Sequence, residues 1–203
     1  MKRLVERTPP ECFQLHARKP GRVYEDDPWH ARRIEKTREA VIVALLDMNK
    51  TPVHRWGKIV ELGCGTADIS GFFSWAHYVL GLEASPTAAI AAAKRYPWMN
   101  VEVVDVQEAV PLPCDIVILT EILEHVADPM LLAEKWLTVS AYSVLSCPID
   151  GDLPKDVSAG EHCWSISETD WSEFFERGQH EVIRKEILSL PDYTIAIGVG
   201  RRV

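Results

Sequence analysis

Two acidic residues and two histidines have the types and spacing that metal-assisted chemistry requires. Glu121 and Glu124 are separated by two residues, and His125 follows Glu124 directly. Side chains at positions i, i+3 and i+4 share one face if this segment forms a helical turn. A second histidine, His162, follows later in the chain. Two carboxylates and two imidazoles suit a divalent cation, which would acidify a coordinated hydroxyl group.

The same residues support two other interpretations. In one, Glu124, His125 and His162 are catalytic without a metal, and His125 serves as a general base or contacts the substrate. In the other, they only stabilise the loops in which they lie. The sequence leaves the metal site, the metal-free catalytic site and the structural role open.

A glycine turn after a buried strand predicts where a larger ligand binds. The apolar run at the start of segment 59–65 leads into Gly63 and Gly65, and glycine lets the backbone approach a ligand closely. Dinucleotide-binding folds also place such a turn after their first strand. However, Asp68 occupies the third glycine position of that fingerprint, where its carboxylate would repel a phosphate. Glu83 follows at about the spacing of a carboxylate that binds ribose hydroxyls, which favours an adenosine ligand without a pyrophosphate.

Four expected strands in a row end in acidic or small polar residues. These strands are 59–62, 78–83, 101–104 and 115–119, and the residues at or after their ends include Glu83, Asp105 and Thr120. In an open parallel sheet, such strand ends form the ligand crevice. The candidate metal ligands of segment 121–125 follow the fourth strand, and His162 follows the fifth, so we expect the four side chains to converge.

Helix caps and hydrophobic periodicity predict the remaining elements. Ser85 and Asp128 each precede a proline, the arrangement of a helix cap and first turn. Helices are expected over 29–48, 87–94, 129–136 and 168–175, and further strands over 142–146, 180–188 and 193–201. The last two strands are expected to pair as a hairpin around residues 191–192. The prediction is an α/β, doubly wound (Rossmann-like) fold with a mostly parallel seven-stranded sheet and a C-terminal antiparallel hairpin.

Composition and charge indicate one globular domain. The chain has 203 residues, 47% of them hydrophobic, and a net charge of −8. We expect an irregular N-terminal arm over residues 1–27 and a single domain over 28–203. The negative charge disfavours nucleic acid as a partner without excluding it. The five cysteines show no paired spacing and no run of residues is apolar enough to span a membrane, so we expect a cytoplasmic location. The sequence does not predict an oligomeric state.

The motifs resemble those of class I S-adenosylmethionine-dependent methyltransferases. The resemblance extends from about residue 28 to the end of the chain, and four segments carry it in the family's order: 61–67, 81–85, 105–106 and 119–129. It implies the fold predicted above and S-adenosylmethionine as the cofactor, with S-adenosylhomocysteine as the product. One departure is Ala67, which occupies the place of a third family glycine.

The resemblance also implies which residues bind the cofactor. Gly63 and Gly65 would approach its methionine part and ribose, Glu83 would accept from the ribose hydroxyls, and Asp105 with the Val106 backbone would bind the adenine. Thr120 would lie below the sulfonium. The full implied set is Glu61, Gly63, Gly65, Glu83, Ala84, Asp105, Val106 and Thr120.

Segment 121–125 and the later His162 are similar to residues of two narrower families. These are the ubiquinone-biosynthesis O-methyltransferases and the small-RNA 3′-terminal 2′-O-methyltransferases, in the second of which such residues hold a metal. We therefore expect methyl transfer to an oxygen atom of a small molecule. The alternatives are a metal-dependent RNA 2′-O-methyltransferase and a non-catalytic S-adenosylmethionine-binding scaffold, and nitrogen acceptors also remain open.

Overall fold

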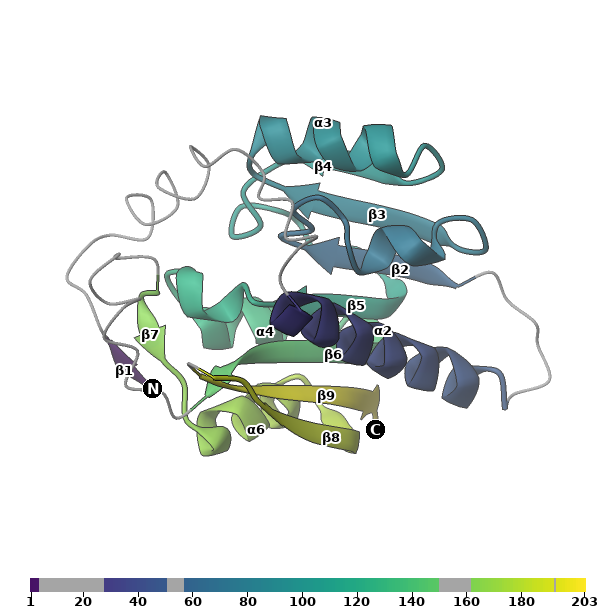
Figure 1. Ribbon diagram of the computed structural model, residues 1–203. Helices are drawn as coiled ribbons and strands as arrows, with labels where there is room; N and C mark the ends of the chain where they lie inside the picture. Colours follow the sequence, from purple (N-terminus) through teal and green to yellow (C-terminus); the bar gives the residue numbers. More distant parts are fainter. Residues whose placement is uncertain (4–27, 51–56, 150–161, 192) are drawn as a thin grey trace.

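A seven-stranded sheet is the centre of the molecule (Figure 1). The computed structural model describes residues 1–3, 28–50, 57–149, 162–191 and 193–203. The strands lie in the order β4-β3-β2-β5-β6-β9-β8. Every neighbouring pair from β4 to β6 is parallel, whereas β9 is antiparallel to both β6 and β8. The predicted doubly wound fold with a C-terminal hairpin is confirmed.

The element bounds differ from the expected ones by a few residues at most. The strands of this sheet are β2 (Lys58–Leu62), β3 (Tyr78–Glu83), β4 (Asn100–Val103), β5 (Cys114–Thr120), β6 (Ser140–Ile149), β8 (His180–Ser189) and β9 (Thr194–Arg202). The helices are α2 (Pro28–Met48), η1 (Ser70–Phe73), α3 (Pro86–Arg95), η2 (Leu123–His125), α4 (Pro129–Leu137) and α6 (Glu168–Arg177).

Side-chain caps begin three of these helices, as their sequences predict. The Ser85 hydroxyl accepts from the Ala88 N–H, and the Asp128 carboxylate accepts from the Leu131 N–H. Ser167 and Asp170 form a reciprocal capping box at the start of α6. These local contacts satisfy N–H groups that the first turn leaves without helical partners.

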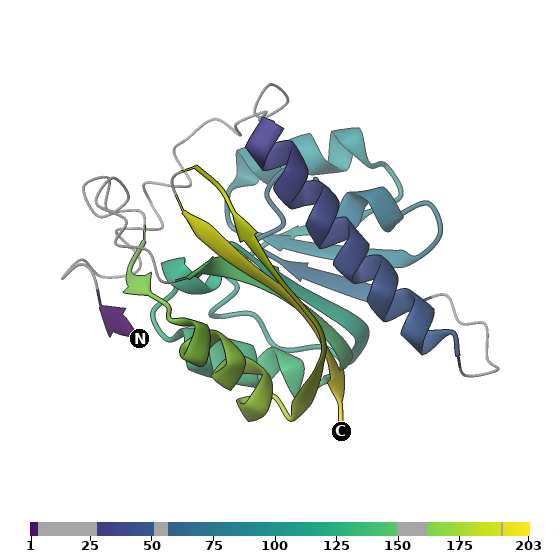
Figure 2. The same ribbon diagram turned by 60° about the horizontal axis from the view of Figure 1, so that its bottom comes forward.

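Two hydrophobic layers cover the two faces of the sheet. Alternate residues of β2 point to opposite faces, so Ile59 belongs to the layer with α2, whereas Val60 belongs to the layer with α4 and α6. Figure 2 shows α2 running across the sheet. Strands β2, β3, β5 and β6 therefore have buried side chains on both faces, as expected for the inner strands of a doubly wound sheet, whereas the edge strand β4 is mostly exposed.

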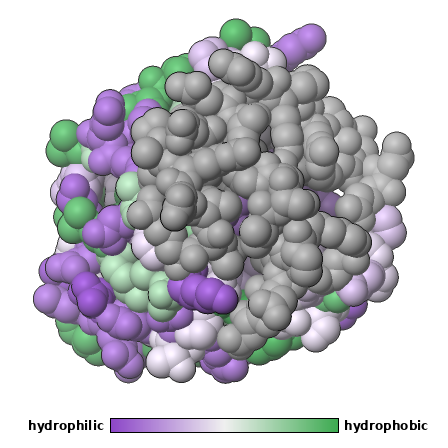
Figure 3. Space-filling model, turned by 90° about the vertical axis from the view of Figure 1, so that its left-hand side faces the viewer, coloured by the Kyte–Doolittle hydropathy of each residue, from purple (hydrophilic) through white to green (hydrophobic). Residues whose placement is uncertain are grey.

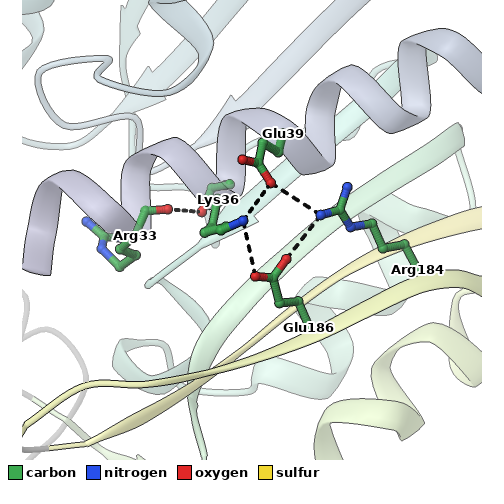
Figure 4. Close-up of polar contacts among 6 residues, drawn as sticks. Arg33, Lys36, Glu39, Arg184 and Glu186 are labelled. Carbon is green, nitrogen blue, oxygen red and sulfur yellow. Dashed lines mark hydrogen bonds and ion pairs between the residues drawn. The ribbon is translucent and has the colours of Figure 1, made fainter.

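Four alternating charges join α2 to β8 (Figure 4). Lys36 Nζ lies 2.9 Å from Glu39 Oε2 and 3.5 Å from Glu186 Oε1. Arg184 Nη2 lies 3.3 Å from Glu39 and 3.1 Å from Glu186. We call these four residues the ion ring. It connects the edge of the hairpin to the helix that covers one face of the sheet.

The N-terminal residues are more regular than expected. Residues 2–3 form β1 (Lys2–Arg3), which pairs antiparallel with β7 (Trp164–Ser165). The terminal ammonium also lies 2.7 Å from Asp170. The rest of the predicted arm, residues 4–27, lies outside the described residues. No helix in the described part of the chain is long and apolar enough to cross a membrane.

Candidate functional site

The glycine turn begins where β2 ends. Gly63 and Gly65 have positive φ angles of 65° and 55°, which glycine adopts without the steric cost that other residues meet. The N–H groups of Gly63 and Cys64 both donate to the Leu82 carbonyl, at 2.8 and 3.2 Å. The turn is therefore tied to the end of β3, the strand that carries Glu83.

The two glycines have different surroundings. A Cβ added at Gly63 would lie 2.3 Å from Ile122 Cδ1, whereas a Cβ at Gly65 would meet no atom within 4 Å. Gly63 thus allows close packing against the loop after β5. The open space at Gly65 is the side from which a ligand can approach the backbone.

Ala67 adopts the conformation that a glycine would favour. Its φ is 60°, its side chain is completely buried, and its N–H donates to the Cys64 carbonyl at 2.7 Å. This geometry gives a physical reason for the third family glycine at this position. The alanine keeps the turn at the cost of left-handed backbone strain.

Acidic side chains at the next two strand ends are held by backbone N–H groups. Glu83 accepts from the N–H groups of Gly65 at 2.8 Å and Ser85 at 2.7 Å. Asp105 accepts from the Gln107 N–H at 2.9 Å. The structure therefore brings Glu83 to the glycine turn, and binding of ribose hydroxyls by this carboxylate stays a prediction.

The remaining predicted cofactor residues lie around this edge of the sheet. Ala84 follows Glu83 directly and Val106 is buried beside Asp105. The Gln107 amide oxygen accepts from the Ala127 N–H at 2.8 Å. Gln107, which no sequence motif indicates, therefore links the Asp105 loop to the loop after β5.

Glu61 is a buried carboxylate beneath the turn. Only 2% of the residue is exposed, and Oε2 accepts from the Ser70 N–H at 3.2 Å. Burial raises the pKa of Glu61 to about 7, against the opposing effect of the Ser70 hydrogen bonds. This carboxyl group therefore titrates near neutral pH.

Two arginines hold the chain after the glycine turn. Arg38 of α2 donates from Nε to the Asp68 carbonyl at 2.9 Å, and Arg95 of α3 forms an ion pair with the Asp68 side chain. Asp68 therefore connects two helices to the turn. The position of Asp68 in the sequence disfavours a phosphate at the turn, but it does not predict these contacts, which join residues far apart in the chain.

Glu121 does not join the predicted ligand group. Its φ is 52°, and the short η2 helix begins only at Leu123, so the expected helical turn over 121–125 is wrong at its first residue. The Glu121 N–H donates to the Ser146 carbonyl at 2.9 Å, and its Oε1 accepts from the Ser146 hydroxyl at 3.0 Å. Thr120, directly before it, is buried opposite Ser146 in the sheet. The left-handed residue turns the Glu121 side chain toward β6.

Glu124, His125 and His162 lie together. One potential ligand atom from each residue lies within 4.8 Å of the other two. The His125 Nε2 atom is 3.7 Å from Glu124 Oε1, and the two imidazole rings are 4.7 Å apart in an edge-to-face arrangement. Glu124 is 1% exposed. We call these three residues the acid-histidine cluster.

Hydrogen bonds to the η2 region fix the segment that carries His162. The Cys163 N–H donates to the Glu124 carbonyl at 2.7 Å, and Trp164 Nε1 donates to the Val126 carbonyl at 2.8 Å. The sequence predicted that these segments would approach each other, but it gave no sign of the Cys163 backbone contact. Trp164 therefore anchors the loop.

Comparisons with known proteins agree with this geometry. Residues 60–140 match the family model described as a methyltransferase domain. No curated protein matches the chain in sequence. A solved structure of the N-methyltransferase NodS from Bradyrhizobium japonicum WM9 with S-adenosylhomocysteine is similar, with a TM-score of 0.72 and 14% identity over 94% of this chain and 98% of that one.

Two other solved structures show the same fold. Magnesium protoporphyrin IX methyltransferase from Synechocystis PCC 6803 with bound S-adenosylmethionine has a TM-score of 0.69 and 16% identity, over 94% of this chain and 91% of that chain. A Leishmania major S-adenosylmethionine-dependent methyltransferase has a TM-score of 0.70 and 10% identity, over 95% and 82%. The chain therefore shares its fold with these proteins, and residues 60–140 match a methyltransferase domain.

Proposed function

We propose that this protein transfers the methyl group of S-adenosylmethionine to an oxygen atom of a small molecule. The observation that carries the proposal is that two groups of residues, the glycine turn with Glu83 and the acid-histidine cluster, lie at the same edge of the sheet. The glycine turn and Glu83 lie at the ends of β2 and β3, and the acid-histidine cluster lies just beyond β5. Methyl transfer requires the acceptor oxygen, the methyl carbon and the sulfur to be held in line, and two adjacent sites can hold the two reactants.

The cofactor side supports binding of an adenosine ligand. Gly65 offers open space beside its backbone, and Glu83 adjoins it. We propose that the Glu83 carboxylate binds the ribose hydroxyls and that Asp105 with the Val106 backbone binds the adenine. Glu61 and Ala84 would complete this side, with Thr120 below the sulfonium.

The acceptor side fits a divalent cation. A carboxylate oxygen and two imidazole nitrogens within 4.8 Å of one another form a donor set typical of zinc, iron or manganese sites. We propose Glu124, His125 and His162 as ligands and leave out Glu121, whose carboxylate is bonded to Ser146. A cation bound there would supply Lewis-acid activation of the acceptor hydroxyl.

This activation supports an oxygen acceptor over a nitrogen acceptor. A hydroxyl group must lose its proton to become a good nucleophile, whereas a neutral amine already carries its reactive electron pair. The two buried or half-buried imidazoles of the cluster, beside a carboxylate, provide groups that promote this proton loss with or without a metal.

The net charge supports a small acceptor. Figure 3 faces the side toward which the parallel strands of Figure 1 point, and both hydrophilic and hydrophobic side chains are visible around the grey residues. The net charge of −8 argues against a polyanion such as RNA. A cytoplasmic location is part of the proposal, and no oligomeric state is proposed.

Calorimetric titration with S-adenosylmethionine and S-adenosylhomocysteine tests the cofactor assignment. We expect both to bind wild-type protein and to bind Glu83→Gln about 10- to 100-fold more weakly, because ribose hydrogen bonds to a charged group are lost. Absence of binding to folded wild-type protein would refute the proposed function.

Metal analysis and an acceptor screen test the chemistry. We expect purified protein to retain about one equivalent of a divalent metal, and a chelator to abolish methylation of catechol-like hydroxyl compounds without removing cofactor affinity. Activity that survives complete metal removal would instead favour His125 as a direct base. Methylation of a short RNA in preference to small acceptors would favour the RNA alternative, and cofactor binding without any turnover would favour a scaffold.

A further inference from the structure

The segment that carries His162 is docked on the residues that carry the rest of the acid-histidine cluster. Three successive backbone carbonyls, those of residues 124–126, accept hydrogen bonds from the two residues that follow His162. The Cys163 N–H donates to the Glu124 carbonyl at 2.7 Å, and the Cys163 thiol donates to the His125 carbonyl at 3.7 Å. Both carbonyls belong to residues whose side chains form the cluster, so this docking brings His162 to its two partners.

The third of these contacts comes from a side chain. The indole Nε1 of Trp164 donates to the Val126 carbonyl at 2.8 Å. Val126 ends η2 with an extended backbone, and a carbonyl at a helix end needs a partner outside the helix. The Trp164 ring also packs against the hydrophobic layer that contains Val126 and Ile166. Since a thiol is a weak donor, the indole N–H is the strongest side-chain contact between the two segments.

The same segment is held by the first residues of the chain. Strand β1 pairs antiparallel with β7, and the Trp164 backbone lies opposite Arg3 (Figure 1). His162 precedes Trp164 by two residues, which span at most about 7 Å of chain. An anchor at Trp164 therefore limits how far the His162 imidazole can move from the His125 imidazole, whose ring centre is 4.7 Å away.

We propose that Trp164 is a positioning residue that sets the affinity of the acid-histidine cluster for a divalent cation. The proposal rests on the proposed function, in which Glu124, His125 and His162 are the metal ligands. A cation binds more tightly where its ligands are already held in place, because less ordering is needed on binding. Trp164 has this effect without touching the cation, since its indole N–H fixes the His162 segment on the turn that carries the other two ligands.

Titration with cobalt(II) tests this role, because the visible absorption of the bound ion reports its ligands directly. Trp164→Phe keeps an aromatic ring and removes the N–H donor. Trp136→Phe is the matched control, because Trp136 is completely buried in the same hydrophobic layer and its Nε1 has no hydrogen-bond partner within the described part of the chain. His162→Ala removes a proposed ligand and serves as the reference for a cluster without this imidazole.

We expect Trp164→Phe to weaken cobalt(II) binding about 10- to 100-fold, the range for residues that support metal ligands, and Trp136→Phe to weaken it less than about twofold. The spectrum of Trp164→Phe at saturating cobalt(II) should match that of wild type, because the ligands are unchanged, whereas the spectrum of His162→Ala should differ. Affinity for S-adenosylhomocysteine should be unchanged in both tryptophan variants, which also shows that they are folded.

A measurement on the wild-type chain alone makes the test independent of how well the variants fold. Coupling between two sites is reciprocal, so saturating zinc should slow the exchange of the Trp164 indole proton with solvent. The indole proton of Trp98, which is 73% exposed, provides the unprotected reference.

Two results would overturn the role of Trp164 and leave the metal site intact. These are a loss of cobalt(II) affinity in Trp164→Phe no larger than in Trp136→Phe, and indole exchange that zinc does not change. Wild-type protein that binds no cobalt(II), or His162→Ala that binds it as tightly as wild type, would overturn the proposed metal site and the role of Trp164 with it. Binding of S-adenosylhomocysteine to the same samples tests the cofactor part of the proposed function separately.

Discussion

The proposed cofactor side and the proposed acceptor side of this molecule are built in different ways. On the cofactor side, Glu83 and Asp105 are held by backbone N–H groups that lie near them in the chain or in the adjoining turn. On the acceptor side, His162 reaches its place through a backbone contact between Cys163 and Glu124, 39 residues apart. One side is assembled mainly by local geometry, and the other by docking of distant segments.

We expect this difference to separate the residues that determine cofactor affinity from those that determine turnover. The cofactor side has rigid turns whose shape depends on glycine and on carboxylates that accept two or more hydrogen bonds. The acceptor side places its titratable groups on a short turn and on the loop that precedes α6. Substitutions on the first side should therefore change cofactor affinity, and those on the second should change turnover.

The largest expected effect is on turnover at the acceptor side. His125→Ala should lower kcat by about 10²- to 10⁴-fold, the range lost when a group that activates a proton transfer is removed. Its Kd for S-adenosylhomocysteine should stay within about twofold of wild type. Single-turnover kinetics with saturating cofactor, combined with calorimetry, would measure both quantities.

Glu83→Gln is the control, because we expect it to change cofactor affinity and not kcat. It should weaken S-adenosylhomocysteine binding while most of kcat is recovered at saturating cofactor. If His125→Ala loses cofactor affinity as strongly as it loses turnover, the division between the two sides does not hold.

The next largest effect distinguishes two glycines of the same turn. Gly63→Ala should lower the free energy of unfolding by about 3 kcal/mol, because it combines left-handed strain with a clash against Ile122. Gly65→Ala carries the strain without the clash and should cost about 1 kcal/mol. Urea denaturation of the two variants would measure the difference.

For cofactor affinity we expect the opposite order, with a larger loss in Gly65→Ala than in Gly63→Ala relative to the loss of stability. The methyl group of Gly65→Ala would enter the open space beside the turn, so a mild loss of stability should accompany a strong loss of S-adenosylhomocysteine affinity. Equal unfolding free energies for the two variants would contradict the packing described around Gly63.

These contrasts also explain how far the sequence could predict the site. The strand ends, the caps at Ser85 and Asp128, and the spacing from Gly65 to Glu83 follow from residue types within short segments, and the structure confirms them. The prediction that Glu121 joins the ligand group depends on a helical turn over residues 121–125. The left-handed backbone of Glu121 depends on the pairing with Ser146 of β6, which no local pattern indicates.

Long-range contacts account for the other residues that the sequence did not identify. Arg38 lies in a helix with many charged residues and Arg95 at the end of α3, and nothing in the sequence distinguishes either of them from a solvated arginine. Only the contacts with Asp68 place these two arginines beside the glycine turn. The sequence alone does not predict how separate helices and strands pack against one another.

We expect the free energy of unfolding to depend on pH through Glu61, with an effect no larger than that of Gly63→Ala. Burial raises its pKa from the ordinary value near 4.5 to about 7, so the folded state holds a proton that the unfolded state loses between these values. This contribution to stability is fully present below about pH 4.5, falls as pH rises, and is lost above about pH 7, a total of up to about 3 kcal/mol.

Glu61→Gln should remove that pH dependence. The variant should match wild type in unfolding free energy near pH 4.5 and exceed it at pH 8, because a neutral amide carries no charge into the buried site. Denaturant titrations across this range would measure it, with Glu35→Gln at an exposed position of α2 as the control. A parallel slope in wild type and Glu61→Gln would show that Glu61 is not the group responsible.

The smallest expected effect comes from the ion ring, which joins α2 to the edge strand β8. Arg184→Met removes one of its two cations, and because all four side chains are partly exposed, the pair energies are screened by solvent. We expect the melting temperature to fall by about 1–3 °C at low salt, with less difference from wild type at 1 M salt. Cofactor affinity should change little, since Thr37, Ala40 and Val41 still pack α2 against the sheet. A loss of S-adenosylhomocysteine affinity comparable to that expected for Glu83→Gln would mean that the ion ring contributes to cofactor binding.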